Sequence, residues 1–479
     1  MSLWTSHDLA AAAGGTLVGD ARPVGGASID TRTLRPGDAF FAIRGDRDGH
    51  DFAAAALADG AALAVVAAGR AEALKGAGPL IVVPAEGEDP VLAAMERIGR
   101  AARARAENTR IVAVTGSVGK TGTKEALALA LEGEGPTHAS VASYNNHWGV
   151  PLTLARMPAD SAFGVFEVGM NHAGEIAPLT RMIRPHVALI TAVEPVHIEF
   201  FRALAGIADA KGELFLGLEP GGVAILPRDN VHFARLAAHA GASRAGRTLS
   251  FGEHAEADVR AERIVIKPDL SIVDARVMGQ RVTYQVGLPG RHVALNSLGV
   301  MAAVHALGAD LARAGLAMAG LRPLVGRGER TRLTVGDGAV QLIDESFNAN
   351  PASMRAALAN LAATEPGRRG RRIAVLGDMG ELGHGGPAFH AELAEPAAAS
   401  ADLVFTAGPL MDRLFEALPA ERRGARAPSA DALAAAVVAA VRPGDVVMVK
   451  SSKSTKTGRI VEALKARYAA APAGAAASA

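Results

Sequence analysis

Short apolar runs alternate with helix-forming segments in two series along this chain. In the first series, apolar runs occupy 111–114, 163–168 and 187–193, and the segment 204–218 is expected to be helical. The second series begins near residue 339 and contains the runs AVQLID, IAVLGD, DLVFTAG and DVVMVKSS, each followed by a helix candidate. Continuous apolar runs joined by helices are typical of a mostly parallel sheet covered on both faces. The pattern therefore predicts two doubly wound α/β domains.

A smaller domain is expected before these two. The first hundred residues mix short strand candidates, 39–43 and 63–66, with polar turns, and AENTR (106–110) then leads into the first apolar run. With 479 residues the chain is too long for one core, and about three domains are the natural expectation. We predict a small mixed α/β domain, a central domain with a mostly parallel sheet and a doubly wound C-terminal domain, with the boundaries 1–105, 106–322 and 323–479.

The composition narrows the class of protein. Hydrophobic residues make up 49% and charged residues 21%, which is a globular composition, and the net charge of +1 gives no electrostatic reason to expect nucleic acid or an anionic membrane as the main partner. The absence of cysteine excludes disulfides, thiolate zinc sites and thiol catalysis. The N-terminal segment has no secretory signal, and the longest apolar run, Ala432–Val441, is half the length of a membrane span, which takes roughly 20 residues. We expect a soluble, cytoplasmic protein.

The segment VTGSVGKTGTKE follows the apolar run 111–114 and precedes a helix candidate. A glycine-rich turn between a strand and a helix lets backbone N–H groups converge on phosphate oxygens at the positive end of the helix. Lys120 would add a charge for the terminal phosphates, and Thr121 a hydroxyl for magnesium. The standard nucleotide-loop pattern has a glycine where Val114 stands, so an ordinary strand–turn–helix corner remains the alternative.

A bound nucleotide needs a metal with oxygen ligands, and three residues after the loop are candidates to hold one. Glu167 ends an apolar strand, where ligand sites of open α/β sheets lie, and a carboxylate is costly there unless something pairs with it. His197 follows the next strand by four residues, and Lys211 lies in a helical segment. The alternatives are an exposed glutamate at a strand end, a structural histidine and an exposed lysine.

The last third of the chain has a second group of polar residues after an apolar strand. Asp344 stands at the end of LID, and Asn348, Asn350 and Pro351 follow, with Ser353 as a possible helix cap. Two asparagines and a proline also suit a tight turn for structural reasons alone. Similarly, Arg327 in LVGRGER could clamp a charge or belong to a linker.

Taken in order, these segments resemble the ATP-dependent Mur ligases of bacterial cell-wall synthesis. The resemblance covers nearly the whole chain and is carried by IDTRTLRPGDAFFAIRGDRDGHDF (29–52), VTGSVGKTGTKE (114–125), SYNNHWGVPLTLARM (143–157), FEVGMNHAGEI (166–176), IADAKGELF (207–215), IDESFNANPASMRAAL (343–358) and LGDMGELG (376–383). It implies a first domain that binds a uridine nucleotide sugar, a central ATPase domain and a Rossmann-like third domain.

The resemblance is greatest to the members that join D-alanyl-D-alanine to UDP-N-acetylmuramoyl-tripeptide through an acyl phosphate, and it implies ATP and two Mg²⁺ ions as cofactors. It implies a role in peptidoglycan precursor synthesis, and a monomer that neither binds nucleic acid nor inserts in the membrane. The alternative inside the family is the ligase that adds the third amino acid, diaminopimelate or lysine. Those relatives usually carry an Asp-Asn-Pro-Arg-like motif, whereas GDMGELG (377–383) occupies the comparable region here.

Two more distant alternatives fit the sequence less well. Folate polyglutamylation enzymes share the ATP loop, but they should lack the uridine-binding first segment. A binding or regulatory protein that has lost catalysis would not need Lys120, Glu167, His197 and Lys211, all of which are present.

The resemblance assigns one group of residues to ATP: Gly116, Ser117, Val118, Gly119, Lys120, Thr121, Asn296, Arg327 and Asp344. Lys120 would contact the β- and γ-phosphates, and Asn296 the adenine side. Val293 follows His292 where relatives often have asparagine, which weakens the Asn296 assignment. Phe347 stands where relatives commonly have tyrosine, so a hydroxyl contact is missing there.

A second group would hold magnesium: Thr121, Glu167, His197 and Lys211, the last as a carbamate. Because a carbamate forms on an uncharged amine, Lys211 must then be shielded from solvent. The catalytic residues implied are Lys120, Lys211 and His197.

A third group is expected on the substrate side. Thr31 and Arg32 lie in the segment that helps the first domain of relatives hold the uridine nucleotide. Asn145 and Asn146 match an Asn-Asn segment that faces the ATP and metal region, and Asn348 and Asn350 complete this group.

Overall fold

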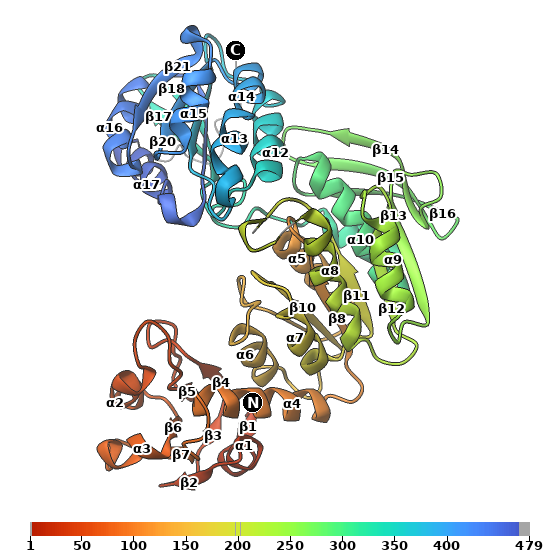
Figure 1. The fold of residues 1–479 in the computed structure, drawn as a ribbon, viewed down its shortest axis with the longest axis vertical. Coiled ribbons are helices and arrows are strands. Elements are labelled where there is room, and N and C mark those ends of the chain that lie inside the picture. Colours follow the sequence, from red (N-terminus) through yellow and green to blue (C-terminus); the bar gives the residue numbers. More distant parts are fainter. Residues whose placement is uncertain (1, 197, 202, 469–479) are drawn as a thin grey trace.

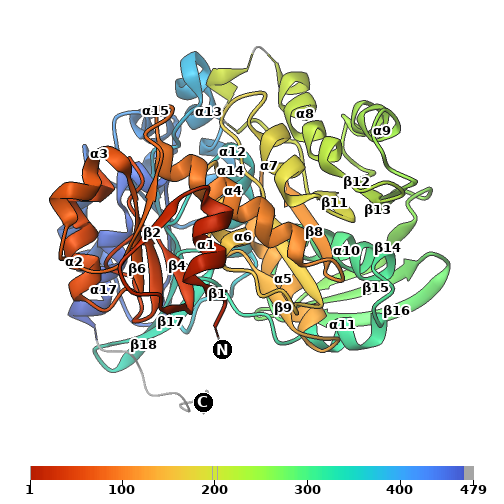
Figure 2. The ribbon, with the colours of Figure 1, turned by 90° about the horizontal axis from the view of Figure 1, so that it is seen from below.

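The computed structural model describes residues 2–196, 198–201 and 203–468. The first and third domains lie at opposite ends of the central domain, on the same side of it (Figures 1 and 2). The predicted α/β class is confirmed, with mostly parallel sheets. Within the described residues, no helix combines the length and hydropathy needed to cross a membrane.

The first domain is built on a sheet of order β2-β7-β6-β5-β4, parallel except for β2, beside a small β1-β3 pair. Its elements are β1 (Trp4–Thr5), α1 (Ser6–Ala13), β2 (Thr16–Val18), β3 (Pro23–Val24), β4 (Gly26–Ser28), β5 (Asp38–Phe41), α2 (Ala53–Ala58), β6 (Leu63–Ala67), α3 (Ala68–Ala71), β7 (Leu80–Val83) and α4 (Pro90–Arg105), with 3₁₀ turns η1 (Gly49–Phe52) and η2 (Glu72–Leu74). Asp89 caps α4 by accepting from two backbone N–H groups, and Pro90 opens the helix.

The first domain is joined to the central domain by more than the connecting chain. Leu152 and Ala155 of α6 belong to the same apolar cluster as the first-domain core. The Trp4 indole donates to the Ala155 carbonyl over 2.9 Å, and Arg156 donates to the Ala27 carbonyl over 2.7 Å. These contacts fix the first domain against α6.

The central domain has a sheet of order β16-β15-β14-β13-β12-β11-β8-β10-β9, which is parallel from β9 to β14 and ends in the antiparallel β14-β15-β16 meander. Its elements are β8 (Arg110–Thr115), α5 (Lys120–Glu132), β9 (Thr137–Ala139), α6 (Gly149–Ala155), β10 (Phe163–Glu167), α7 (Ile176–Ile183), β11 (Val187–Ile190), η3 (Ile198–Phe200), α8 (Leu204–Gly212), η4 (Glu213–Gly217), β12 (Val223–Pro227), α9 (Phe233–Gly241), β13 (Arg247–Gly252), β14 (Val259–Ile266), β15 (Ser271–Val277), β16 (Gln280–Val286), α10 (Arg291–Ala306) and α11 (Leu311–Met318).

The helix expected over 204–218 is shorter than predicted. It ends at Gly212 and continues as the 3₁₀ turn η4. Gly217 lies against the backbone of α7, where an added β-carbon would be 2.2 Å from the Thr180 carbonyl oxygen. The tighter turn permits this close approach, which the apolar pattern of the segment does not reveal.

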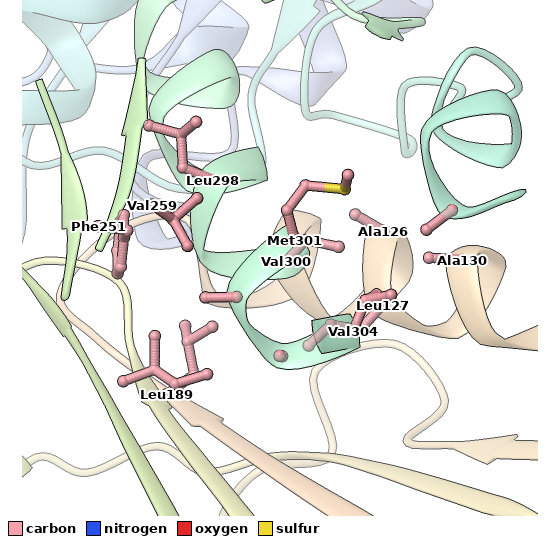
Figure 3. Packing of buried hydrophobic residues seen from close by; sticks show 14 of the residues in the cluster. Ala126, Leu127, Ala130, Leu189, Phe251, Val259, Leu298, Val300, Met301 and Val304 are labelled. Carbon is pink, nitrogen blue, oxygen red and sulfur yellow. The ribbon is translucent and has the colours of Figure 1, made fainter. Parts of the chain in front are cut away.

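Helices α5 and α10 lie beside each other, and both pack directly on the central sheet, α5 on β8, β9 and β10 and α10 on β11 to β16; Figure 3 shows the side chains where they meet. Leu298, Val300, Met301 and Val304 of α10 belong to one buried cluster with residues of α5 and of the strands, namely Ala126, Leu127, Ala130, Leu189, Phe251 and Val259. Full burial of each large apolar side chain contributes about 1.5–3 kcal/mol to the stability of the fold. This packing holds the N-terminal turns of α10 and α5 side by side, and both turns carry residues of the candidate site.

The third domain has a sheet of order β17-β18-β22-β19-β20-β21, in which only the edge strand β17 is antiparallel. Its elements are β17 (Glu329–Val335), β18 (Gly338–Glu345), α12 (Pro351–Ala362), β19 (Arg372–Gly377), η5 (Gly383–Gly385), α13 (Gly386–Ala391), α14 (Ala394–Ser400), β20 (Leu403–Ala407), α15 (Met411–Ala417), η6 (Ala420–Arg422), β21 (Arg423–Ala427), α16 (Ala430–Ala440), β22 (Val446–Lys450), η7 (Lys453–Thr455) and α17 (Gly458–Arg467). All four apolar runs of the second series form strands of this sheet.

Candidate active site

The glycine-rich segment forms a loop between β8 and α5. Gly116 and Gly119 have φ values of +154° and +82°, a backbone region that favours glycine. An added β-carbon would lie 1.8 Å from Thr191 Oγ1 at Gly116 and 2.1 Å from Asn296 Nδ2 at Gly119. Both glycines are therefore required by neighbouring side chains as well as by the turn, and Asn296 of α10 touches the loop directly.

The loop is held from the side of β11. Ser117 donates from its backbone N to the Ala192 carbonyl over 2.8 Å and from Oγ to the Glu194 carbonyl over 2.9 Å. Thr191 Oγ1 donates to the Val118 carbonyl over 2.6 Å. These bonds fix the loop before any ligand arrives, which lowers the entropic cost of binding an anion.

Lys120 is the first residue of α5, and its Nζ donates to the Gly116 carbonyl over 2.6 Å. Burial lowers the pKa of Lys120, and the nearby Glu167 carboxylate opposes that change. The ammonium therefore lies over the loop that would receive phosphates.

Glu167 is the last residue of β10, and its side chain is buried at 1% exposure. Its Oε1 accepts a 2.7 Å hydrogen bond from Asn145 Nδ2, whereas its buried Oε2 has no partner within the described chain. An unpaired buried carboxylate oxygen is costly, and it is the hard ligand that Mg²⁺ prefers. The donor chemistry of this position fits a magnesium ion, and Thr121 Oγ1, 3.4 Å from Ser143 Oγ, lies in the same cavity.

Lys211 lies in α8 with 3% of its surface exposed. No hydrogen bond or ion pair of its ammonium is present among residues 2–196, 198–201 and 203–468. Burial, reinforced by the charge of Lys120, holds the pKa of Lys211 well below its usual value. The side chain is therefore shielded, and its burial favours the uncharged amine.

A cavity of about 400 Å³ opens between the central and third domains beside these residues. It is lined by the loop and α5, by α10, and by the third-domain segment after β18. The candidates from the sequence that line it are Ser117, Val118, Gly119, Lys120, Thr121, Asn145, Glu167, Asn296, Arg327, Asn348 and Asn350. Gly116, Asn146, Lys211, Asp344, Thr31 and Arg32 are not among its lining residues, and His197 lies outside the described residues.

Arg327 enters the cavity from the chain that leads into the third domain. Its Nη2 donates to Ser143 Oγ over 3.3 Å, and its guanidinium carbon lies 4.0 Å from the centre of the Phe347 ring. Burial lowers the pKa of Arg327, and the carboxylates of Glu167 and Glu345 oppose this. Arg327 thus connects the site of the central domain to the loop after β18.

The neighbour of Asp344 reaches the cavity instead of Asp344 itself. Asp344 is buried, and its Oδ1 accepts from the backbone N and the Oγ of Ser346 over 3.0 and 2.6 Å. Successive side chains of a strand point to opposite faces, so Glu345 lines the cavity. It pairs there with Lys450 of β22, whose Nζ is 3.3 Å from Glu345 Oε2 and donates to the Asn348 carbonyl over 3.0 Å.

Sequence reasoning missed Lys450 and Glu345. The available signal for Lys450 was a charged residue at the end of the apolar run DVVMVKSS, the same signal that pointed to Glu167. The expected cap also differs in detail: Asn350 is the N-cap of α12, and Ser353 returns a hydrogen bond in a capping box. Asn350 therefore lines the cavity and also stabilises a helix end.

The candidates of the first domain lie in the turn after β4. Arg32 forms an exposed ion pair with Asp30, with 2.6 Å between Nη2 and Oδ2, and this pair lowers the pKa of Asp30. The Asp30 carboxylate in turn raises the pKa of Arg32, and Tyr144, next to Asn145, adds a smaller contribution. Asn146 turns away from Asn145 and accepts from the Gly149 backbone N over 2.9 Å at the start of α6.

Comparison with known families accounts for this arrangement. The chain matches models described as Mur ligase family, catalytic domain (residues 23–110), Mur ligase middle domain (114–304) and Mur ligase, glutamate ligase domain (326–453). It is 36% identical over 384 residues to a protein of Escherichia coli, covering 80% of each chain, and 36% identical over 442 residues to one of Synechocystis, covering 91% of each. The chain belongs to the Mur ligase family. Both relatives of this Mur ligase are named UDP-N-acetylmuramoyl-tripeptide–D-alanyl-D-alanine ligase.

Solved structures of the family have the same fold as this Mur ligase. MurF from Acinetobacter baumannii superimposes with a TM-score of 0.82 at 26% identity, covering 96% of this chain and 98% of that one. MurF from Thermotoga maritima, solved in complex with ADP, gives a TM-score of 0.73 at 24% identity, over 92% and 97% of the two chains. The resemblance seen in the sequence is thereby confirmed at the level of family and fold.

Proposed function

We propose that this Mur ligase joins D-alanyl-D-alanine to UDP-N-acetylmuramoyl-tripeptide in peptidoglycan precursor synthesis, with ATP converted to ADP and phosphate. The observation that carries the proposal is 36% identity over most of the chain to two relatives named for this activity. The cavity between the phosphate loop and the third domain supports it, because a nucleotide held there is reached by cations from both domains.

Amide formation from a carboxylate requires activation of that carboxylate, which a site that binds ATP can provide. A carboxylate does not form an amide directly, because oxide is not a feasible leaving group. Transfer of the γ-phosphoryl group to a carboxylate oxygen releases ADP and gives an acyl phosphate. The dipeptide amine then attacks the carbonyl carbon, and the C–O bond to phosphate breaks, so one donor oxygen leaves in the phosphate.

Both steps gather negative charge on oxygen atoms, and the catalytic need is for fixed cations more than for a strong base. In this proposal, backbone N–H groups from Gly116 to Thr121 and the Lys120 ammonium hold the phosphates. Arg327 adds a guanidinium from the third-domain side. Asn296 supports the loop at Gly119 and lies toward the nucleotide base.

Magnesium would be held by Thr121, Glu167, His197 and a carbamate on Lys211, with two ions expected. A bound magnesium ion supplies positive charge to phosphoryl oxygens. The unpaired Oε2 of Glu167 and the burial of Lys211, which lowers the pKa of its amine, support this assignment. A carbamate would turn the buried amine of Lys211 into an anionic oxygen ligand.

The substrate would extend from the first domain to the cavity. Thr31 and Arg32 would hold the uridine nucleotide, and Asn145, Asn146, Asn348 and Asn350 would lie along the reacting end. The proposal includes the domain boundaries 1–105, 106–322 and 323–479, and a monomer that acts in the cytoplasm without nucleic acid or membrane insertion. The net charge of +1 supports the last point.

The decisive experiment measures phosphate release with UDP-N-acetylmuramoyl-tripeptide, ATP and Mg²⁺, comparing D-alanyl-D-alanine with single amino acids. Selective turnover with the dipeptide is expected. If the enzyme instead joined diaminopimelate or lysine to UDP-N-acetylmuramoyl-dipeptide, it would be the ligase that adds the third amino acid. Transfer of ¹⁸O from the donor carboxylate to phosphate is expected, and its absence would rule out the acyl phosphate.

A further inference from the structure

Two stretches of chain after β11, residues 193–196 and η3 (Ile198–Phe200), contact the phosphate loop and the third domain respectively. The first stretch is hydrogen-bonded to the central domain. The Val193 carbonyl accepts from Asn230 Nδ2 over 3.1 Å, and Glu194 exchanges two 2.9 Å hydrogen bonds with Ser117, one at its carbonyl and one at its backbone N. Any displacement of Glu194 therefore pulls on the phosphate loop.

The second stretch, η3, contacts the third domain. Ile198 packs against the apolar cluster of the central domain and also against the cluster of the third domain that includes Met379, Leu382 and Leu393. Among the described residues it is shared by these two clusters, and its segment η3 touches η5. In Figure 1 the third domain lies beyond the end of the central domain that carries α5 and α8.

Two glutamates on either side of Ile198 in the chain, Glu199 and Glu194, are also influenced by the third domain. An added β-carbon on Gly383 would lie 3.0 Å from Glu199 Cβ, so the turn with φ of +55° at Gly383 is packed against the segment. The charge of Arg355 of α12, which is paired with Glu392 over 3.0 Å, acts on the half-buried Glu194 carboxylate and opposes the rise in its pKa that burial causes. Residues of the third domain thus lie near Glu199 and act on Glu194.

We propose that the contacts of Ile198 and Glu194 together couple docking of the third domain to the geometry of the phosphate loop, with Ile198 as the positioning residue. Docking of the third domain seats Ile198 in both clusters, and the hydrogen bonds between Glu194 and Ser117 transmit that position to the loop. The inference rests on the proposed function for its consequence in catalysis. The coupling would align the phosphate loop of the central domain with the cavity residues of the third domain.

The test uses Ile198→Ala, the conservative variant Ile198→Leu, and Leu216→Ala as a control. Leu216 is 46% exposed on η4 and belongs to neither cluster, so its truncation removes a similar side chain outside the proposed route. We expect Ile198→Ala to lower the kcat of ligation about tenfold or more, with the KM of the uridine substrate within about twofold. Ile198→Leu should restore most of kcat, and Leu216→Ala should match the wild type.

Docking is measured separately by cross-linking. Because the chain has no cysteine, Glu199→Cys with Gly383→Cys gives a single disulfide-forming pair between the two domains, at positions close enough for the bond. In this background, Ile198→Ala should slow disulfide formation and weaken Mg²⁺–ATP binding, each by about threefold or more. Unchanged cross-linking and ATP binding in Ile198→Ala would overturn the proposal, whatever happens to kcat.

The cross-linking and ATP-binding measurements need no ligation. If the wild-type protein formed no amide product, the proposed function would fail while these two measurements still decided the coupling. Wild-type ligation with Ile198→Ala equal to wild type in every measurement would overturn the coupling and leave the proposed function intact.

Discussion

Asn145 donates a 2.7 Å hydrogen bond from Nδ2 to Oε1 of Glu167, and this bond leaves the second oxygen of a buried carboxylate without a partner. The Asn145 amide holds the carboxylate in one orientation, and Oε2 points to where a cation would bind. One oxygen of Glu167 is thus hydrogen-bonded, and the other is buried without a partner. A buried unpaired oxygen does not stabilise the fold, so its presence indicates a binding role.

Glu167→Gln should remove the charged ligand while keeping the hydrogen bond from Asn145. We expect kcat/KM for ligation to fall about 10²- to 10³-fold, because a fixed electrostatic contact in the transition state is lost. The Mg²⁺ concentration for half-maximal rate should rise. The thermal midpoint should not fall, since an unpaired buried charge is removed. Titration of phosphate release against Mg²⁺ tests this, with the exposed Glu256→Gln as control; an unchanged Mg²⁺ requirement would refute the role of Glu167.

Lys120→Ala should lower the ligation rate by about 10³-fold or more, because both phosphoryl transfer and its charge stabilisation depend on the loop lysine. The hydrogen bond from Nζ to the Gly116 carbonyl is also lost, so ATP affinity should fall with it. Lys75→Ala is a suitable control, since this lysine is 78% exposed in the first domain. Ligation at the wild-type rate by Lys120→Ala would show that this lysine has no catalytic role.

Much of the fold could be predicted from the sequence, because strands of a parallel sheet that are buried on both faces appear as short continuous apolar runs. The runs 111–114, 163–168 and 187–193 became β8, β10 and β11, and the four later runs became strands of the third domain. Glu167 could be identified because a carboxylate at the end of an apolar strand has few inexpensive environments, and Lys120 because it belongs to the glycine-rich loop pattern.

The remaining differences have physical causes outside the local pattern. In β18 both faces are covered, so apolar residues do not alternate and the sequence does not tell which of Asp344 and Glu345 faces the cavity. The pairing of Lys450 with Glu345 depends on β22 lying beside β18, which is a long-range contact. The end of α8 at Gly212 depends on the close approach of Gly217 to α7.

Phe347→Ala should weaken ATP binding modestly. The ring stacks on the Arg327 guanidinium at 4.0 Å, and cation–π contacts of this kind contribute about 0.5–1 kcal/mol. We expect the KM for ATP to rise about two- to fivefold, with Phe347→Tyr remaining close to the wild type because the ring is kept. Initial rates at varied ATP test both variants. Equal KM values for Phe347→Ala and the wild type would show that the stack does not position Arg327.

Gly119→Ala should abolish ATP binding, because the new methyl group would meet Asn296 Nδ2 at 2.1 Å and because alanine is strained at a φ of +82°. Gly119→Ala combined with Asn296→Ala removes the clash but keeps the backbone strain, so it should recover part of the affinity. Calorimetric titration with Mg²⁺–ATP compares the two variants with Asn296→Ala alone. No recovery in the double variant would assign the whole defect to the backbone.

The buried amine of Lys211 gives a pH prediction with a defined sign. Its pKa is well below the usual value in the folded protein, so between that pKa and about 10.5 the unfolded chain binds one more proton than the folded chain. Stability contributed by this site therefore rises with pH, by about 1.4 kcal/mol per pH unit within that window.

Lys211→Met should accordingly be more stable than the wild type near neutral pH in CO₂-free buffer, and the difference should shrink as the pH rises toward 9.5. Thermal unfolding of both proteins across this range measures the difference, with Lys75→Met as an exposed control. Addition of bicarbonate should stabilise the wild type alone, because only it can form a carbamate, and ¹³C-labelled bicarbonate should give a carbamate resonance that Lys211→Met lacks. A stability difference that is independent of pH would mean that Lys211 is charged in the folded protein, and it would exclude the carbamate.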